Sequence, residues 1–205
     1  MKNTMTSHKV YGAWEYERET RDLNEYSIKG WQLKKGGCFY SKFVRDENIR
    51  YIYQLDYAPK IEDQEMYLSF FEEQGWEYIN STFNGWHYFR KKYYEGMPEE
   101  EMEIYTDQES LVEMQKRYGK LILFLDAVCA FEAVLCTGMT IKHEGDIALL
   151  LEMLFFYFGA IFFGLVYANI KRVQKGQKEL MPIRHTMFGW GFLIFIFALI
   201  IFNLF

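Results

Sequence analysis

The stretch LNEYSIKGWQL (Leu23–Leu33) is matched in outline, 45 residues later, by LSFFEEQGWEY (Leu68–Tyr78). Both stretches place apolar residues at helical spacing and contain a Gly-Trp pair, at Gly30–Trp31 and at Gly75–Trp76. A glycine can adopt the left-handed conformation that ends a helix, and the tryptophan after it favours a strand. We therefore predict an internally duplicated unit in which a helix, a glycine cap and a strand follow one another.

The two tryptophans of this repeat are candidate structural core residues. Trp31 and Trp76 each follow a predicted helix directly, so each indole ring can cover the helix end and enter the core. Aromatic rings of this size contribute much of the buried area of a small domain.

The sequence around the repeat predicts strands. IRYIYQLDY (Ile49–Tyr57) alternates so that one face meets helices and the other is largely in water. We predict a leading strand at Val10–Tyr16, a strand at Phe39–Arg45, and a turn at Asp46–Asn48. The resulting order is that of an α+β two-layer sandwich, an antiparallel sheet with helices on one face, for which the ferredoxin-like arrangement is one option.

The soluble part is predicted to end before an acidic linker. Residues 1–95 form the α+β domain, residues 96–119 a linker and connecting helix, and residues 120–205 a membrane domain. Asp107 is placed to cap the connecting helix, which has acidic residues early and basic residues late, as the helix dipole favours.

Several landmarks of the soluble part occur in a recognisable order: KGW, YIYQLDY, YLSFFEEQGWEYI, WHYFRK and EIYTDQES. This order resembles the bacterial family of uncharacterised proteins DUF2812 over roughly residues 9–118. The resemblance implies a soluble domain joined to C-terminal membrane helices and a connection with small transcriptional regulators. It implies no catalytic residues.

Three apolar runs, Leu121–Ile141, Ile147–Ile170 and Met187–Phe205, each have about the length that spans a bilayer as a helix. Basic residues flank the first run on its N-terminal side and fill the loop 171–184, whereas the loop 142–146 has one lysine. The positive-inside rule then predicts a multi-pass protein of the cell membrane, with a cytoplasmic N-terminal domain and an external C-terminus.

Three acidic residues interrupt the predicted spans. Asp126 and Glu132 lie in the first span and Glu152 in the second, and none of the three spans contains Lys or Arg. Ionisable residues at such depths are functional candidates. Two interpretations stay open: the acids are protonated and tolerated, or they face a polar seam that meets a helix, a cation or a partner protein.

Charge and composition exclude several classes of function. Residues 1–119 contain 16 Lys and Arg against 22 Asp and Glu, which argues against nucleic acid as a partner. Three cysteines cannot form a disulfide framework or a four-thiolate zinc site. The residues suggest no catalytic constellation, cofactor or metal site, so we do not expect an enzyme.

Two hypotheses of function follow. In the first, the chain is a non-enzymatic, membrane-anchored regulatory or adaptor protein whose cytoplasmic domain binds a protein or a small ligand. In the second, it is a transporter or transporter-accessory subunit that uses the intramembrane acids. The expected partners are the lipid bilayer together with a protein partner or further copies of the chain.

Overall fold

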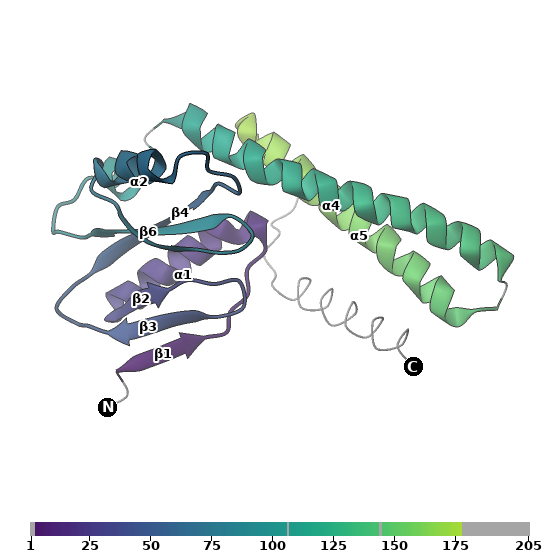
Figure 1. Ribbon diagram of the computed structural model, residues 1–205, viewed down its shortest axis with the longest axis horizontal. Helices are drawn as coiled ribbons and strands as arrows, with labels where there is room; N and C mark the ends of the chain where they lie inside the picture. Colours follow the sequence, from purple (N-terminus) through teal and green to yellow (C-terminus); the bar gives the residue numbers. More distant parts are fainter. Residues whose placement is uncertain (1–2, 106, 144, 178–205) are drawn as a thin grey trace. The chain divides into compact units, whose positions relative to one another are not determined.

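The computed structural model describes residues 3–105, 107–143 and 145–177 (Figure 1). The chain divides into two compact units, Met1–Met114 and Gln115–Phe205. The elements of the first unit are β1 (Thr4–Ser7), the 3₁₀ turn η1 (Ala13–Glu15), α1 (Tyr16–Ile28), β2 (Trp31–Lys35), β3 (Ser41–Arg45), β4 (Tyr51–Tyr57), α2 (Gln64–Glu72), β5 (Glu77–Ser81), β6 (Trp86–Lys92) and α3 (Glu99–Met102). Then follow α4 (Gln108–Lys142), which begins in the first unit, and α5 (Ile147–Gln174).

The α+β class is confirmed, but the strands form two antiparallel sheets of three strands instead of one sheet. The first sheet has the order β1-β3-β2 and the second the order β4-β6-β5. Each sheet is thus built from a β-α-β-β segment whose first and last strands pair. The pairing shifts by one residue between Leu33 and Lys35 in β2, and between Tyr78 and Asn80 in β5.

Glycine caps end both repeat helices, as predicted from the local sequence. Gly30 has φ +78° and Gly75 has φ +83°, which is the left-handed region that suits glycine. The cap at α4 is also confirmed, because the Ser110 N–H donates to Asp107 Oδ1 at 2.8 Å.

The predicted leading strand at Val10–Tyr16 is wrong. The first strand is β1, and residues 10–16 form a loop, η1 and the start of α1. Glu15 accounts for this, because its carboxylate accepts a hydrogen bond from the Gly12 N–H at 2.9 Å and pairs with Arg18 at 2.8 Å. Contacts of this kind stabilise the first turn of a helix. Here they outweigh the alternation of apolar residues that suggested a strand.

The prediction that one face of the Ile49–Tyr57 strand is largely in water is also wrong. In β4, Ile52 and Asp56 are buried on the face opposite Tyr53 and Leu55. Helices cover both faces of the second sheet, α1 on one side and α2 on the other (Figure 1). The core beneath α2 contains Ile52, Phe71, Trp76, Phe89, Met97 and Ile104.

The structure differs from the predicted linker at residues 96–119. Met97 and Ile104 are 5% and 3% exposed and pack in the core beneath α2. These two apolar side chains attach an otherwise charged stretch of the chain to the core. The first unit accordingly extends to Met114.

Two asparagine side chains bind strand edges as a neighbouring strand would. Asn24 of α1 accepts from the Tyr53 N–H at 2.7 Å and donates to the Tyr53 carbonyl at 3.2 Å. Asn80 of β5 accepts from the Gly36 N–H at 2.8 Å and donates to the Gly36 carbonyl at 2.9 Å. Each amide therefore satisfies both backbone groups of one residue at an edge.

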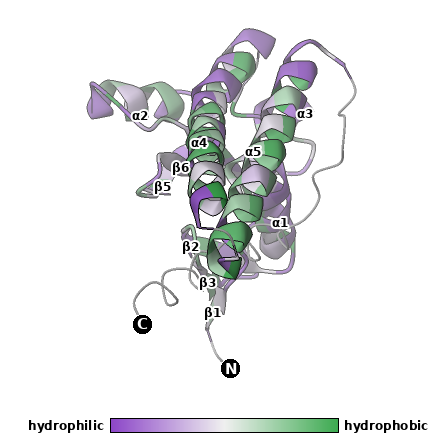
Figure 2. Cartoon of the chain, turned by 90° about the vertical axis from the view of Figure 1, so that its right-hand side faces the viewer, coloured by the Kyte–Doolittle hydropathy of each residue, from purple (hydrophilic) through white to green (hydrophobic). Residues whose placement is uncertain are grey.

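In the second unit, α4 and α5 pack as an antiparallel pair. Both helices are long and apolar enough to cross a membrane, and α5 is hydrophobic over most of its length (Figure 2). The two helices meet where the hydroxyls of Thr137 and Tyr157 lie 3.1 Å apart. They also meet where Asp126 lies beside Gly164. The third predicted span, Met187–Phe205, lies outside the described residues.

Candidate functional site

A cleft of about 600 Å³ lies in the first unit between α1, β4 and the segment that leads into α4. Its lining residues are Tyr16, Glu17, Thr20, Arg21, Asn24, Glu25, Ile28, Arg50, Ile52, Gln54, Leu55, Met102, Glu103, Tyr105 and Leu111. Sites for small molecules have volumes of about 300–1,000 Å³ and combine apolar walls with a few polar groups. This cleft has both properties.

Gln54 attaches the segment before α4 to the second sheet at the cleft wall. Its Nε2 donates to the Met102 carbonyl at 2.9 Å and to Glu103 Oε2 at 3.1 Å. Loss of surrounding water raises the pKa of Glu103, the charges of Glu17 and Glu99 raise it further, and the bond from Gln54 opposes them. A cation bound near Glu103 would offset this unfavourable environment of the carboxylate.

The two arginines of the cleft are placed differently. Arg21 is exposed on α1, whereas the Arg50 guanidinium carbon lies 3.8 Å from the centroid of the Tyr93 ring. Arg50 Nε is buried without a hydrogen-bond partner among the described residues. The cleft has three carboxyl groups and two guanidinium groups, one of which is stacked on an aromatic ring.

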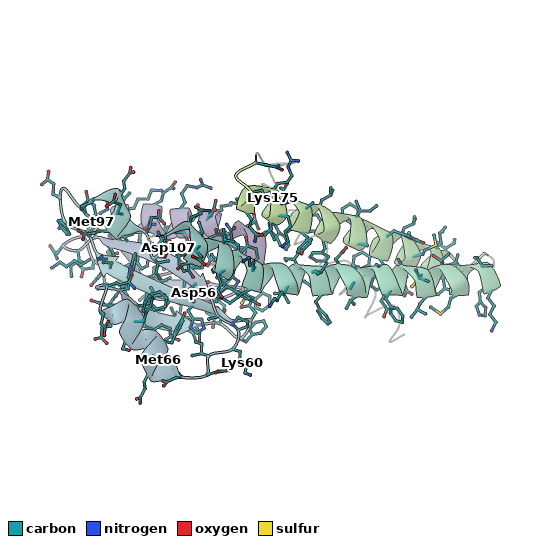
Figure 3. All side chains as sticks on the ribbon, turned by 90° about the horizontal axis from the view of Figure 1, so that it is seen from above. Asp56, Lys60, Met66, Met97, Asp107 and Lys175 are labelled. Atoms are coloured by element: carbon teal, nitrogen blue, oxygen red, sulfur yellow. The ribbon has the colours of Figure 1, made fainter. Side chains whose placement is uncertain are left out.

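A buried carboxylate fixes the cleft residue Tyr105. Asp56 of β4 is 1% exposed, and the hydroxyls of Tyr105 and of Tyr67 in α2 both donate to it, the latter at 2.6 Å. Figure 3 shows Asp56 inside the first unit and Met66 of α2 pointing outward. One buried carboxyl group thus joins β4, α2 and the segment before α4.

A second buried carboxyl group lies outside the cleft, on the inner side of α1. Glu19 is 8% exposed and accepts a hydrogen bond from the Tyr88 hydroxyl at 2.6 Å. Burial raises its pKa to about 7, with smaller contributions in the same direction from Asp22 and Glu15 and an opposing one from the bond to Tyr88.

This environment predicts that the first unit loses stability as the pH rises. Between the ordinary pKa of 4.5 and the folded value of about 7, the folded state keeps a proton that the unfolded state releases. We expect Glu19→Gln, which removes the titration, to stabilise a Met1–Met114 fragment by roughly 2–3 kcal/mol more at pH 8 than at pH 5. Urea unfolding at both pH values measures this difference.

The matched control is Glu17→Gln, on the exposed side of the same helix. It should change the free energy of unfolding similarly at both pH values. An equal effect of Glu19→Gln at pH 5 and pH 8 would contradict the assignment of a proton to Glu19.

The three intramembrane candidates are all partly exposed. Asp126 lies on the face of α4 that meets α5, where its Oδ1 is 3.6 Å from the point that a Cβ would occupy at Gly164. Glu132 is on α4 and Glu152 is on α5. Among the described residues, no group of three or more His, Cys, Asp or Glu side chains could hold a metal ion.

The two tryptophans of the repeat have different surroundings. Trp76 is 2% exposed in the core beneath α2. Trp31 is partly exposed, and the Arg45 guanidinium carbon lies 5.0 Å from its ring centroid.

Sequence reasoning missed the cleft and the buried carboxyl groups of Asp56 and Glu19. One signal was present for Asp56, a single acid within the aromatic strand YIYQLDY. No comparable signal marks Glu19, which is one of several acids along α1.

Comparison with known proteins gives the family to which the chain belongs. The sequence model of the family described as "Protein of unknown function (DUF2812)" matches residues 15–126, from the end of η1 into α4. No curated protein and no solved structure matches the chain. The family match covers the cleft, Asp56 and Glu19, and the chain belongs to the DUF2812 family.

Proposed function

We propose that the chain is a non-enzymatic, membrane-anchored regulatory protein whose cytoplasmic domain binds a small molecule in the cleft. One observation carries the proposal: the cleft wall includes Tyr105, which precedes α4, and Leu111 in the first turn of α4, the helix that continues as the first apolar span. Binding in the cleft can therefore change the position or order of the N-terminal end of α4. This gives the domain a physical means of signalling to the membrane helices.

The lining supports a ligand with an apolar body and an amino group. Ile28, Ile52 and Leu111 offer apolar contact, and Glu103 is a carboxyl group whose charge is poorly compensated. A ligand ammonium group near Glu103 would relieve that charge, whereas a carboxylate ligand would add to it.

The test uses the full chain in mild detergent and a set of alkylamines with matched alcohols and carboxylates. We expect the amines alone to raise the thermal midpoint and to slow hydrogen exchange in residues 102–113. Glu103→Gln should remove both effects, and Glu72→Gln, at an exposed position of α2 outside the cleft, should leave them unchanged. Equal effects of amines and carboxylates, or of wild type and Glu103→Gln, would contradict the proposal.

The proposal includes the orientation predicted from the basic loop 171–184, and this can be tested separately. In a chain with Cys38, Cys129 and Cys136 replaced by Ala, a cysteine at Glu144 should react with an impermeant thiol reagent in intact cells. A cysteine at Gln177 should react only after lysis. The reverse pattern would place the soluble domain outside.

The proposal also treats the soluble domain as two β-α-β-β halves that arose by duplication. Three features support this: the shared β-α-β-β order, the glycine caps, and the pairing shifts at corresponding positions of β2 and β5. One half then supplies α1 and the other β4 to the cleft.

A transporter-accessory role is the second candidate, and Asp126 favours it. A carboxyl group beside Gly164 between two apolar helices is a group whose charge a cation or a partner's basic side chain would offset. Affinity purification in mild detergent should then recover a large transport protein with wild type and lose it with Asp126→Asn. Glu132→Gln and Glu152→Gln serve as comparisons at the other two acids.

A further inference from the structure

The acidic soluble unit contains a stretch without any acidic residue. Residues 26–45 contain five cations and no Asp or Glu. Two of the five are paired, since Lys29 lies 3.7 Å from Glu25 and Arg45 binds Glu47. The other three, Lys34, Lys35 and Lys42, have no ion pair within the part of the chain that the structure describes.

These three lysines lie together at one end of the first sheet. Lys35 of β2 is directly opposite Lys42 of β3, and Lys34 is at the shift in the pairing. Like charges directly opposite each other on a sheet are unfavourable. The fold thus keeps a concentrated positive charge that no ion pair among the described residues offsets, and Lys42 Nζ lies 5.6 Å from the centroid of the Tyr40 ring.

Exposed aromatic rings accompany the lysines. The loop between β2 and β3 exposes Phe39 by 56% and Tyr40 by 41%, and the turn between β5 and β6 exposes Phe83 by 85%. The two loops touch, because the Cys38 thiol donates to Asn84 Oδ1 at 3.3 Å. We call Lys34, Lys35, Phe39, Tyr40, Lys42 and Phe83 the basic-aromatic tip.

We propose that the basic-aromatic tip binds the surface of an anionic lipid bilayer. Lysines attract the phosphates of anionic headgroups, and aromatic rings are stable at the boundary between headgroups and acyl chains. The proposal rests on the proposed function in one respect, that the chain is anchored in a membrane. Anchoring keeps the tip at a high effective concentration beside lipid, so a small number of contacts suffices.

Nucleic acid is the less favoured anionic partner. The basic-aromatic tip is confined to two loops and one sheet end, and the rest of the unit is acidic, whereas a nucleic-acid site needs a longer basic surface.

The experiment uses the full chain in lipid nanodiscs, with Cys38 replaced by Ser to keep a hydrogen-bond donor to Asn84, Cys129 and Cys136 replaced by Ala, and a bimane label on Phe83→Cys. Nitroxide groups on the lipid headgroups quench bimane on contact. We expect quenching at least three-fold stronger in discs containing phosphatidylglycerol than in pure phosphatidylcholine discs. A label on Phe70→Cys, in the exposed face of α2, should show no such difference.

Lys35→Gln with Lys42→Gln should reduce the quenching in phosphatidylglycerol to the level in phosphatidylcholine. This variant should remain folded, since it removes a repulsion. Lys60→Gln with Lys92→Gln, an equal change in charge on other elements, should leave the quenching unchanged.

Three outcomes overturn the inference. If the chain does not co-elute with nanodiscs, membrane anchoring fails and the inference fails with it. If the chain is incorporated but quenching is absent or independent of the headgroup, only the inference fails. If a single-stranded oligonucleotide shifts bimane emission in phosphatidylcholine discs while phosphatidylglycerol causes no quenching, the basic-aromatic tip is a nucleic-acid site.

Discussion

A fragment ending at Glu95 is expected to lack a cooperative unfolding transition, whereas a fragment ending at Met114 should unfold cooperatively in water. The shorter fragment lacks Met97 and Ile104, which pack in the core beneath α2. It also lacks the hydrogen bond that the Tyr105 hydroxyl donates to Asp56. Each buried apolar side chain contributes about 1.5–3 kcal/mol, and an orphaned buried acceptor costs about 1–3 kcal/mol. Together these losses approach the whole stability of a domain, about 5–15 kcal/mol.

Urea unfolding followed by tryptophan fluorescence and by circular dichroism measures this difference. Met97→Ala and Tyr105→Phe in the longer fragment serve as intermediate cases, because each removes one part of what the truncation removes. Coincident, cooperative transitions of the two fragments at similar midpoints would show that residues 96–114 are the tether predicted from the sequence.

Replacement by Ala should lower the free energy of unfolding by very different amounts at Trp76 and at Trp31. Trp76→Ala in the Met1–Met114 fragment is expected to cost about 3–5 kcal/mol, because the ring is buried and leaves a cavity. Trp31→Ala should cost less than about 2 kcal/mol, since the ring is partly exposed and its contact with Arg45 contributes about 0.5–1 kcal/mol.

Each variant serves as the control for the other, because both remove a tryptophan side chain directly after a helix-ending glycine. Chemical unfolding gives both values. Equal losses would mean that the repeat places the two rings in equivalent surroundings, contrary to the structure.

The features that the sequence predicted are those that neighbouring residues determine. Gly30 and Gly75 end their helices because a left-handed residue is required where each helix stops, and Asp107 caps α4 through its own first turn. The covered second face of β4 was missed because its cover, Phe71 and Ile104, comes from distant segments. Alternation of side chains shows that a strand has two faces, and packing decides which of them meets water.

The candidate site was harder to predict for the same reason. The cleft joins Arg21, Gln54 and Leu111, which lie far apart in the chain and belong to no common motif. The intramembrane acids were found at once, because a charge within an apolar run is visible locally. The position of Asp126 beside Gly164 depends on the pairing of α4 and α5, which the sequence does not reveal.

The two asparagine bridges have a consequence for the newly made chain. Asn24 precedes Tyr53, so the amide that protects the edge of β4 has already been synthesised when that strand leaves the ribosome. Asn80 follows Gly36 by 44 residues, so the edge beside β2 stays open until the second half of the domain has been translated. An open edge can recruit strands from other chains. During synthesis the edge beside β2 therefore stays open to other chains for longer than the edge of β4 does.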